Sequence, residues 1–173
     1  MKITRLVFFS SLLLIGKTIY CQSFEVPDNY QFNSKEDYSK YEKDIIDAAK
    51  WLKDTPFNEQ EDKRKEVSAF VVKWINGSPT VNVEINPTIM DFEKKNKGML
   101  VLYMAASARY VLENNYSKDM RAKHKAALND MMSVYKSGKG INKDKKIEKL
   151  IKSEEDGKLD EWLSENLKID ERH

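Results

Sequence analysis

The chain has 173 residues, of which 34% are charged and 40% are hydrophobic, and its formal net charge is +2. This length suits one ordinary domain with a core of its own. The nearly balanced charge provides no overall field that would attract a polyanion, so a nucleic-acid partner is not expected. Cys21 is the only cysteine, which excludes a disulfide within the chain.

Residues 1–21 are typical of a secretory signal peptide. Lys2 and Arg5 precede an apolar run over residues 6–15. This run is about half as long as the roughly 20 residues that a spanning helix needs, so a stable membrane anchor is not expected. Removal of the segment takes away Lys2, Arg5 and Lys17, which lowers the 30 basic residues to 27, against 28 acidic residues.

Cys21 allows two interpretations of the processing site. In a lipoprotein this cysteine would become the lipid-bearing first residue, but the residue before it should then be small, and it is Tyr20. Ordinary cleavage before Gln22 is therefore favoured over lipid anchoring through Cys21. Both interpretations place the protein outside the cytoplasm, and we expect it in the periplasm or the extracellular space.

Two helices are predicted after an extended segment over residues 22–33. Ser34 can cap a helix whose apolar positions recur at spacings of three and four as far as Leu52. Asn58-Glu59-Gln60-Glu61 has the capping-box pattern and predicts a second helix, for which Gly77 is a suitable C-terminal residue.

Residues 80–85 alternate apolar and polar side chains as a strand does, in the order Thr80-Val81-Asn82-Val83-Glu84-Ile85. A single strand without a partner is marginally stable, so an extended linker across the bundle is the favoured interpretation. Asn86-Pro87 then predicts a short helix with Asn86 as its N-cap and Pro87 at its first position.

The segment Met99 to Leu112 is almost continuously apolar and predicts a buried central helix. Ser117 is the predicted cap of the helix that follows, and two short helices are expected near Ile147 and Trp162. The predicted fold is therefore all-α. Residues 34–173 form one domain, an irregular bundle of six or seven helices around a central apolar helix.

The sequence contains no recognisable catalytic motif. His124 is the only histidine before the C-terminal residue, and no acidic residue lies three or four positions before it, which excludes the common helical zinc and di-iron motifs. Gly-x-Ser-x-Gly and phosphate-loop patterns are absent. We therefore predict no catalytic, metal-binding or cofactor-binding residue and interpret His124 as a helix-face residue with an ordinary hydrogen bond.

Three residues are candidates for binding. Arg109 and Glu113 are charged residues four positions apart on the otherwise apolar central helix, so they can pair there, although the end of the helix also allows them to reach water. Trp74, on the apolar face of the second helix, is the third candidate.

The pattern Trp51-Leu52, Thr55-Pro56, Glu59-Gln60, Lys63-Arg64-Lys65, Trp74 and Gly77-Ser78-Pro79, together with Val26-Pro27, Tyr30, Tyr110 and Leu112-Glu113, resembles an uncharacterised family of small exported proteins of Gram-negative bacteria. The resemblance covers most of the chain after Cys21. It implies a periplasmic or surface location and assigns no active residue.

These observations favour one hypothesis of function over two others. The preferred one is a non-catalytic protein-interaction module in the periplasm, with an unknown protein partner. The alternative is a carrier that holds a small apolar ligand between its helices, where helical bundles often place such sites. An enzyme that uses carboxylates is the least favoured hypothesis, because the sequence singles out no pair of them.

Overall fold

A computed structural model describes residues 23–169. The predicted signal peptide and Cys21 lie outside the described residues. All regular structure in the described range is helical, which confirms the all-α class. The helices are α1 (Lys35–Lys40), α2 (Glu42–Asp54), α3 (Glu61–Gly77), α4 (Pro87–Glu93), α5 (Met99–Glu113), α6 (Met120–Ser137), α7 (Lys145–Glu155) and α8 (Leu159–Leu167).

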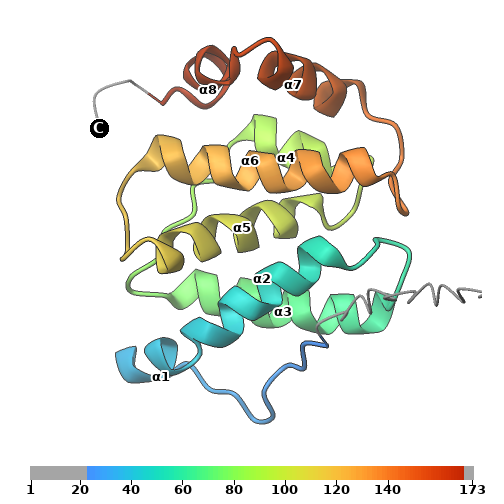
Figure 1. The fold of residues 1–173 in the computed structure, drawn as a ribbon. Coiled ribbons are helices and arrows are strands. Elements are labelled where there is room, and N and C mark those ends of the chain that lie inside the picture. Colours follow the sequence, from blue (N-terminus) through green and yellow to red (C-terminus); the bar gives the residue numbers. More distant parts are fainter. Residues whose placement is uncertain (1–22, 170–173) are drawn as a thin grey trace, which may run out of the picture.

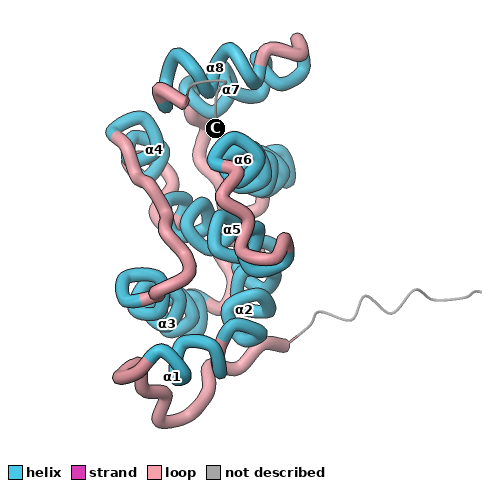
Figure 2. The backbone as a smooth tube through the Cα atoms, turned by 90° about the vertical axis from the view of Figure 1, so that its left-hand side faces the viewer, coloured by secondary structure: helices cyan, strands magenta, loops and turns pink. Residues whose placement is uncertain are grey.

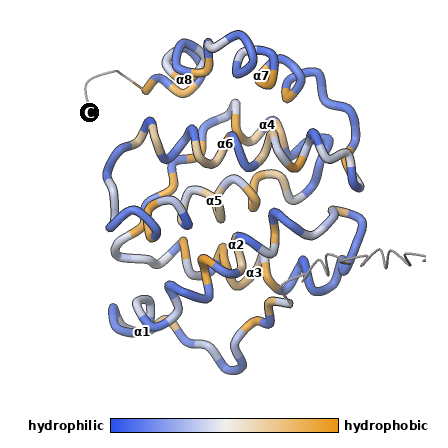
Figure 3. Tube along the Cα trace, in the orientation of Figure 1, coloured by the Kyte–Doolittle hydropathy of each residue, from blue (hydrophilic) through white to orange (hydrophobic). Residues whose placement is uncertain are grey.

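The helices form a stack with α1 at one end and the pair α7 and α8 at the other (Figures 1 and 2). Between these ends, α2 packs against α3, and α4 and α6 each pack against α5. Helix α5 runs through the middle of the stack and packs most extensively against α6 and α2. Hydrophobic residues follow α5 and the sides of the helices that face it, whereas hydrophilic residues dominate the outer helices and loops (Figure 3).

The predicted central helix is confirmed as α5. Most of its side chains are buried, and Met99, Tyr103, Ala105 and Ala108 have no measurable exposure. The Glu93 carboxylate accepts hydrogen bonds from the backbone N–H groups of Gly98, at 2.8 Å, and Leu100, at 2.9 Å. A negative group at a helix N-terminus stabilises unpaired amide donors and the helix dipole, so Glu93 fixes where α5 begins.

The described residues contain eight helices where six or seven were predicted, because the first predicted helix is broken at Tyr41. Its φ of −101° and ψ of 7° lie outside helical geometry. The buried Tyr41 ring packs edge-on against Phe32, with ring centroids 5.5 Å apart, and against Phe70, at 6.2 Å. Packing of this ring takes precedence over the local preference for a continuous helix, which separates α1 from α2.

Two of the predicted helix starts are confirmed. The Ser34 side chain accepts a hydrogen bond from the backbone N–H of Asp37 at 3.3 Å, and Asp37 returns a bond to the Ser34 N–H, which completes a capping box. The Asn86 side chain accepts from the N–H of Ile89 at 3.0 Å, with a proline at the first helical position. Both caps satisfy amide groups that a helix leaves without partners.

The other two predicted starts are wrong. Helix α3 begins at Glu61 after Gln60, which has a left-handed backbone with φ 48° and provides no side-chain cap. The residues before α3 contact a distant part of the chain, because the Phe57 N–H donates to the carbonyl of Lys139 at 3.1 Å. Helix α6 begins two residues later than Ser117 predicts, and Asp119 caps it by accepting from the N–H of Ala122 at 2.9 Å.

The segment before α1 lies along the bundle without forming a helix. Phe24, Tyr30 and Phe32 all contact Phe70 of α3, with ring centroids between 4.9 and 6.3 Å apart. Lys73 lies over the Tyr30 ring at 4.9 Å. Aromatic packing of this kind attaches residues 24–32 to α3.

Candidate functional site

The segment between α3 and α4 is the extended linker that the alternating sequence predicts. Figure 2 shows it at the edge of the molecule, running from the end of α3 to the start of α4. Val81 is buried and Val83 is half-buried, whereas Asn82 and Ile85 are exposed. Val81 and Val83 therefore attach one side of the linker to the bundle, and the alternation of burial ends at Ile85.

The backbone of this linker is largely without hydrogen-bond partners. The N–H groups of residues 82–85 donate to no acceptor in the described part of the chain. The carbonyl of Asn82 accepts from Lys123 Nζ at 3.0 Å. An extended backbone with free donors and acceptors can pair with a second extended chain, as the edge of a sheet does.

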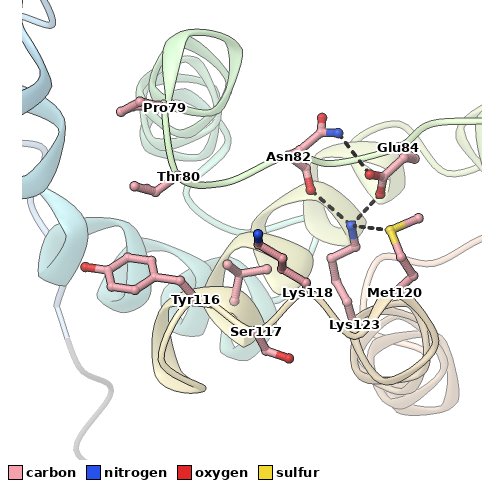
Figure 4. A pocket seen from close by; sticks show the side chains of 10 residues that line it. Pro79, Thr80, Asn82, Glu84, Tyr116, Ser117, Lys118, Met120 and Lys123 are labelled. Carbon is pink, nitrogen blue, oxygen red and sulfur yellow. Dashed lines mark hydrogen bonds and ion pairs between the residues drawn. The ribbon is translucent and has the colours of Figure 1, made fainter. Parts of the chain in front are cut away.

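One side of the linker faces a cavity of about 420 Å³, here called the linker groove. Its other wall is the turn that joins α5 to α6 (Figure 4). The groove is lined by Pro79, Thr80, Asn82, Glu84, Val111, Tyr116, Ser117, Lys118, Met120 and Lys123. Its volume is within the range of about 300–1,000 Å³ that is usual for ligand sites.

The turn that forms this second wall is held in a defined conformation. Asn115 and Tyr116 both have a left-handed backbone, with φ values of 52° and 57°. The Tyr116 N–H donates to the carbonyl of Val111 at 2.9 Å, which is the bond expected of a Schellman end to α5. The Tyr116 hydroxyl donates to Glu42 at 2.8 Å. These bonds fix the tyrosine ring, which is 47% exposed, beside the groove.

The linker groove is closed at one end by an ion pair between Lys123 and Glu84. Lys123 projects from α6 and its side chain is only 5% exposed, whereas the Glu84 side chain is 37% exposed. The ammonium group also bonds to the Asn82 carbonyl and lies 3.6 Å from Met120 Sδ (Figure 4). These contacts compensate for the burial of the ammonium group and attach the linker to α6.

A second cavity of about 280 Å³, here called the α8 pocket, adjoins Glu84 on the other side. It lies between the linker, the start of α6 and the end of α8. Its lining residues are Glu84, Ile85, Asn86, Met120, His124, Leu167, Lys168 and Ile169. Glu84 and Met120 line both cavities, so these two residues form the partition between them.

His124 is buried at 3% exposure, and its Nδ1 atom forms a hydrogen bond with the hydroxyl of Tyr103 on α5. The expected ordinary hydrogen bond of His124 is therefore present, although the residue lies inside the bundle. Burial lowers the pKa of His124 to about 4, and the positive charge of Lys123 acts in the same direction. The imidazole is therefore neutral at pH 7.

The lowered pKa of His124 predicts that the protein loses stability in mild acid. The ordinary pKa of 6.5 applies to the unfolded chain, which therefore binds the proton first as the pH falls. The stability is fully present above pH 6.5 and decreases as the pH falls to about 4, by on the order of 2–3 kcal/mol. Urea unfolding of the wild type and of His124→Gln at pH 7 and at pH 4.5 measures this loss of stability. The wild type should lose more stability than the variant, and equal losses would contradict the assignment.

Trp74, one of the predicted binding residues, lies in the core. Its side chain has no exposure, and the indole Nε1–H donates to the Tyr38 carbonyl at 3.0 Å. The Tyr38 ring also covers Gly77 so closely that a Cβ atom at that position would collide with its hydroxyl. Trp74 therefore presents no surface to a partner in this conformation, and Gly77 provides space for Tyr38.

Arg109 and Glu113 form the predicted pair, with Arg109 Nε 3.5 Å from Glu113 Oε2. Both belong to a larger network of charges. Arg109 Nη2 lies 2.8 Å from Asp130 on α6, in an ion pair without hydrogen-bond geometry. Lys53 lies 2.6 Å from Asp130, and Lys50 lies 2.8 Å from Glu113. The network joins α2, α5 and α6, so its geometry is that of a structural connection.

No single sequence motif predicts the candidate site. The structure brings together Glu84 and Asn82 from the linker with Lys118 and Lys123 from the start of α6. The alternation of residues 80–85 was the only relevant sequence feature, and it indicated an extended segment without indicating which helix lies beside it.

Residues 23–169 contain no group of three His, Cys, Asp or Glu side chains arranged to hold a metal ion. None of its helices is both long enough and apolar enough to span a bilayer. Comparisons with protein-family models, with curated proteins and with solved structures return no match for the chain.

Proposed function

We propose that this chain is an exported, non-catalytic protein-interaction module, and that the linker groove binds an extended, acidic segment of a partner polypeptide. The observation that carries the proposal is a linker in which the N–H groups of residues 82–85 donate to no acceptor in the described chain, and in which Asn82 and Glu84 line a groove of about 420 Å³. A polypeptide in extended conformation is the ligand that can pair with these donors and acceptors along the chain.

The charges of the groove favour an acidic partner segment. The ammonium group of Lys123 is neutralised by Glu84. Lys118 projects from the opposite turn toward the linker (Figure 4), and it has no ion pair in the described part of the chain. An acidic side chain of the partner would meet this lysine, and such complementarity selects the partner and its register.

Apolar side chains around the groove provide hydrophobic contacts with the partner segment in addition to backbone pairing. The large hydrophobic residues that are exposed in the described chain are Ile85, Met90 and Tyr116. Tyr116 lines the linker groove, and Ile85 lines the α8 pocket next to it. Alternate side chains of an extended segment point to the same side, so every second residue of the partner faces these surfaces.

Selection from a library of random linear peptides tests the proposal. We expect the selected peptides to contain acidic residues alternating with apolar ones. Lys118→Glu should weaken their binding by about tenfold or more, because a like charge replaces an attractive one. The matched control is Lys97→Glu, an exposed lysine outside both cavities, which should bind within about twofold of the wild type. Basic selected peptides, or equal effects of the two variants, would contradict the proposal.

Export is tested separately, by the mass of the protein recovered from the periplasm of a Gram-negative host. A chain that begins at Gln22 and carries no adduct is the expected result. A lipid on Cys21 would place the protein on a membrane surface, and protein that is found only in the cytoplasm, with residue 1 retained, would contradict export.

A further inference from the structure

The α8 pocket is lined by a histidine that has one ring nitrogen without a hydrogen-bond partner. His124 lines this pocket although the residue is only 3% exposed. Its Nδ1 atom is occupied by the Tyr103 hydroxyl. Its Nε2 atom lies 3.9 Å from Glu84 Oε2, which is too long for a hydrogen bond, and no other partner is present in the described residues. A polar atom beside a cavity that has no hydrogen-bond partner in the described residues marks a position for a ligand atom.

The partner on Nδ1 determines which nitrogen of His124 carries the proton. Burial raises the pKa of the Tyr103 hydroxyl, so the phenol keeps its proton at neutral pH. The Glu84 carboxylate, 3.9 Å from Nε2, favours the tautomer with its proton on that nitrogen, so we assign the hydroxyl as the donor to Nδ1. A neutral imidazole that accepts at Nδ1 has its proton on Nε2. The nitrogen that faces the α8 pocket is accordingly a donor, and its ligand must supply an acceptor.

The surroundings of this donor define the rest of the ligand. Lys168 is exposed at the end of α8 and has no ion pair in the described part of the chain, and Lys123 and Glu84 neutralise each other. The pocket therefore carries one uncompensated positive charge. The opposing walls are apolar side chains from three elements: Ile85, Met120, Leu167 and Ile169.

We infer that the α8 pocket binds a small monocarboxylate with an apolar body, whose carboxylate accepts a hydrogen bond from His124 Nε2 and meets the ammonium group of Lys168. The volume of about 280 Å³ limits the ligand to a short aliphatic or single-ring acid. The inference does not depend on the proposed protein partner, because the linker groove lies on the other side of Glu84.

Nitrogen-15 NMR of the histidine side chains in the full chain, titrated with hexanoate, tests this site. In the free protein the His124 signals should show the proton on Nε2, and hexanoate should shift the Nε2 signal in a saturable manner. Hexylammonium, which has the same apolar body and the opposite charge, should produce no such shift. A proton on Nδ1, or no saturable shift with hexanoate, would overturn the inference.

Two variants distinguish the donor from a general role of His124 in folding. His124→Gln keeps an N–H group close to the Nε2 position, whereas His124→Asn keeps one close to Nδ1. We expect His124→Gln to bind hexanoate within about threefold of the wild type and His124→Asn to bind at least about tenfold more weakly. Equal affinities would overturn the inference. If either variant fails to fold, the wild-type titration alone decides.

Discussion

Replacing Trp74 by alanine is expected to lower the free energy of unfolding by about 3–5 kcal/mol. The indole has no exposure, packs against Tyr38 with ring centroids 6.2 Å apart, and donates to the Tyr38 carbonyl. The substitution removes a large apolar group and leaves a cavity between α1 and α3. It also removes one of the two hydrogen bonds to that carbonyl, which keeps the bond from the Tyr41 N–H.

Urea unfolding followed by circular dichroism measures this loss, with Trp162→Ala as the matched control. Trp162 lies on α8 and is half-buried, so its loss should cost less than half as much. Equal costs for the two variants, or a loss below about 1 kcal/mol for Trp74→Ala, would show that Trp74 does not occupy the core position described here.

Replacing Arg64 by methionine is expected to cost about 2–4 kcal/mol, although the substitution removes a buried charge. Arg64 is 8% exposed and has no carboxylate partner in the described residues. Its guanidinium donates to the carbonyls of Leu52, Thr55 and Pro56, at the end of α2 and just beyond it. Burial lowers its pKa to about 10, so it remains charged at neutral pH.

The expected cost of this substitution comes from the carbonyl groups. Methionine fills similar space but offers no donor, so the carbonyls at the end of α2 lose their partner while they stay buried. Arg64→Lys should fall between the wild type and Arg64→Met, because one ammonium group replaces a planar group with several donors. Lys65→Met, next in sequence and exposed, is the control and should leave the stability close to that of the wild type. If Arg64→Met were as stable as the wild type, the hydrogen bonds from Arg64 to these carbonyls would make no net contribution to stability.

The sequence predicts the helices well where the determining contacts lie within a single helix. The apolar run that forms α5 requires burial whatever surrounds it, and the Asn86 cap is a contact within four residues. The predictions that failed depend on distant residues. The break at Tyr41 follows from Phe32 and Phe70, and the late start of α3 accompanies a bond from Phe57 to Lys139. Local patterns contain no information about such neighbours.

The candidate site is less predictable for the same reason. Glu84 and Lys123 are 39 positions apart, and each is an ordinary charged residue in its own segment. His124 looked like a typical helix-face residue because its partner, Tyr103, is on another helix. Arg109 and Glu113 were found because they are four apart on one helix, which is the type of contact that a sequence shows directly.

Hydrogen exchange of the backbone amides, with and without a selected acidic peptide, tests the central claim most directly. In the free protein, the amides of residues 82–85 should exchange rapidly, whereas those of α5 should exchange most slowly. The account predicts that the bound peptide protects residues 82–85 and leaves the exchange of α5 unchanged. Peptide binding that protects another surface and leaves residues 82–85 exchanging rapidly would contradict the linker groove as the site of interaction.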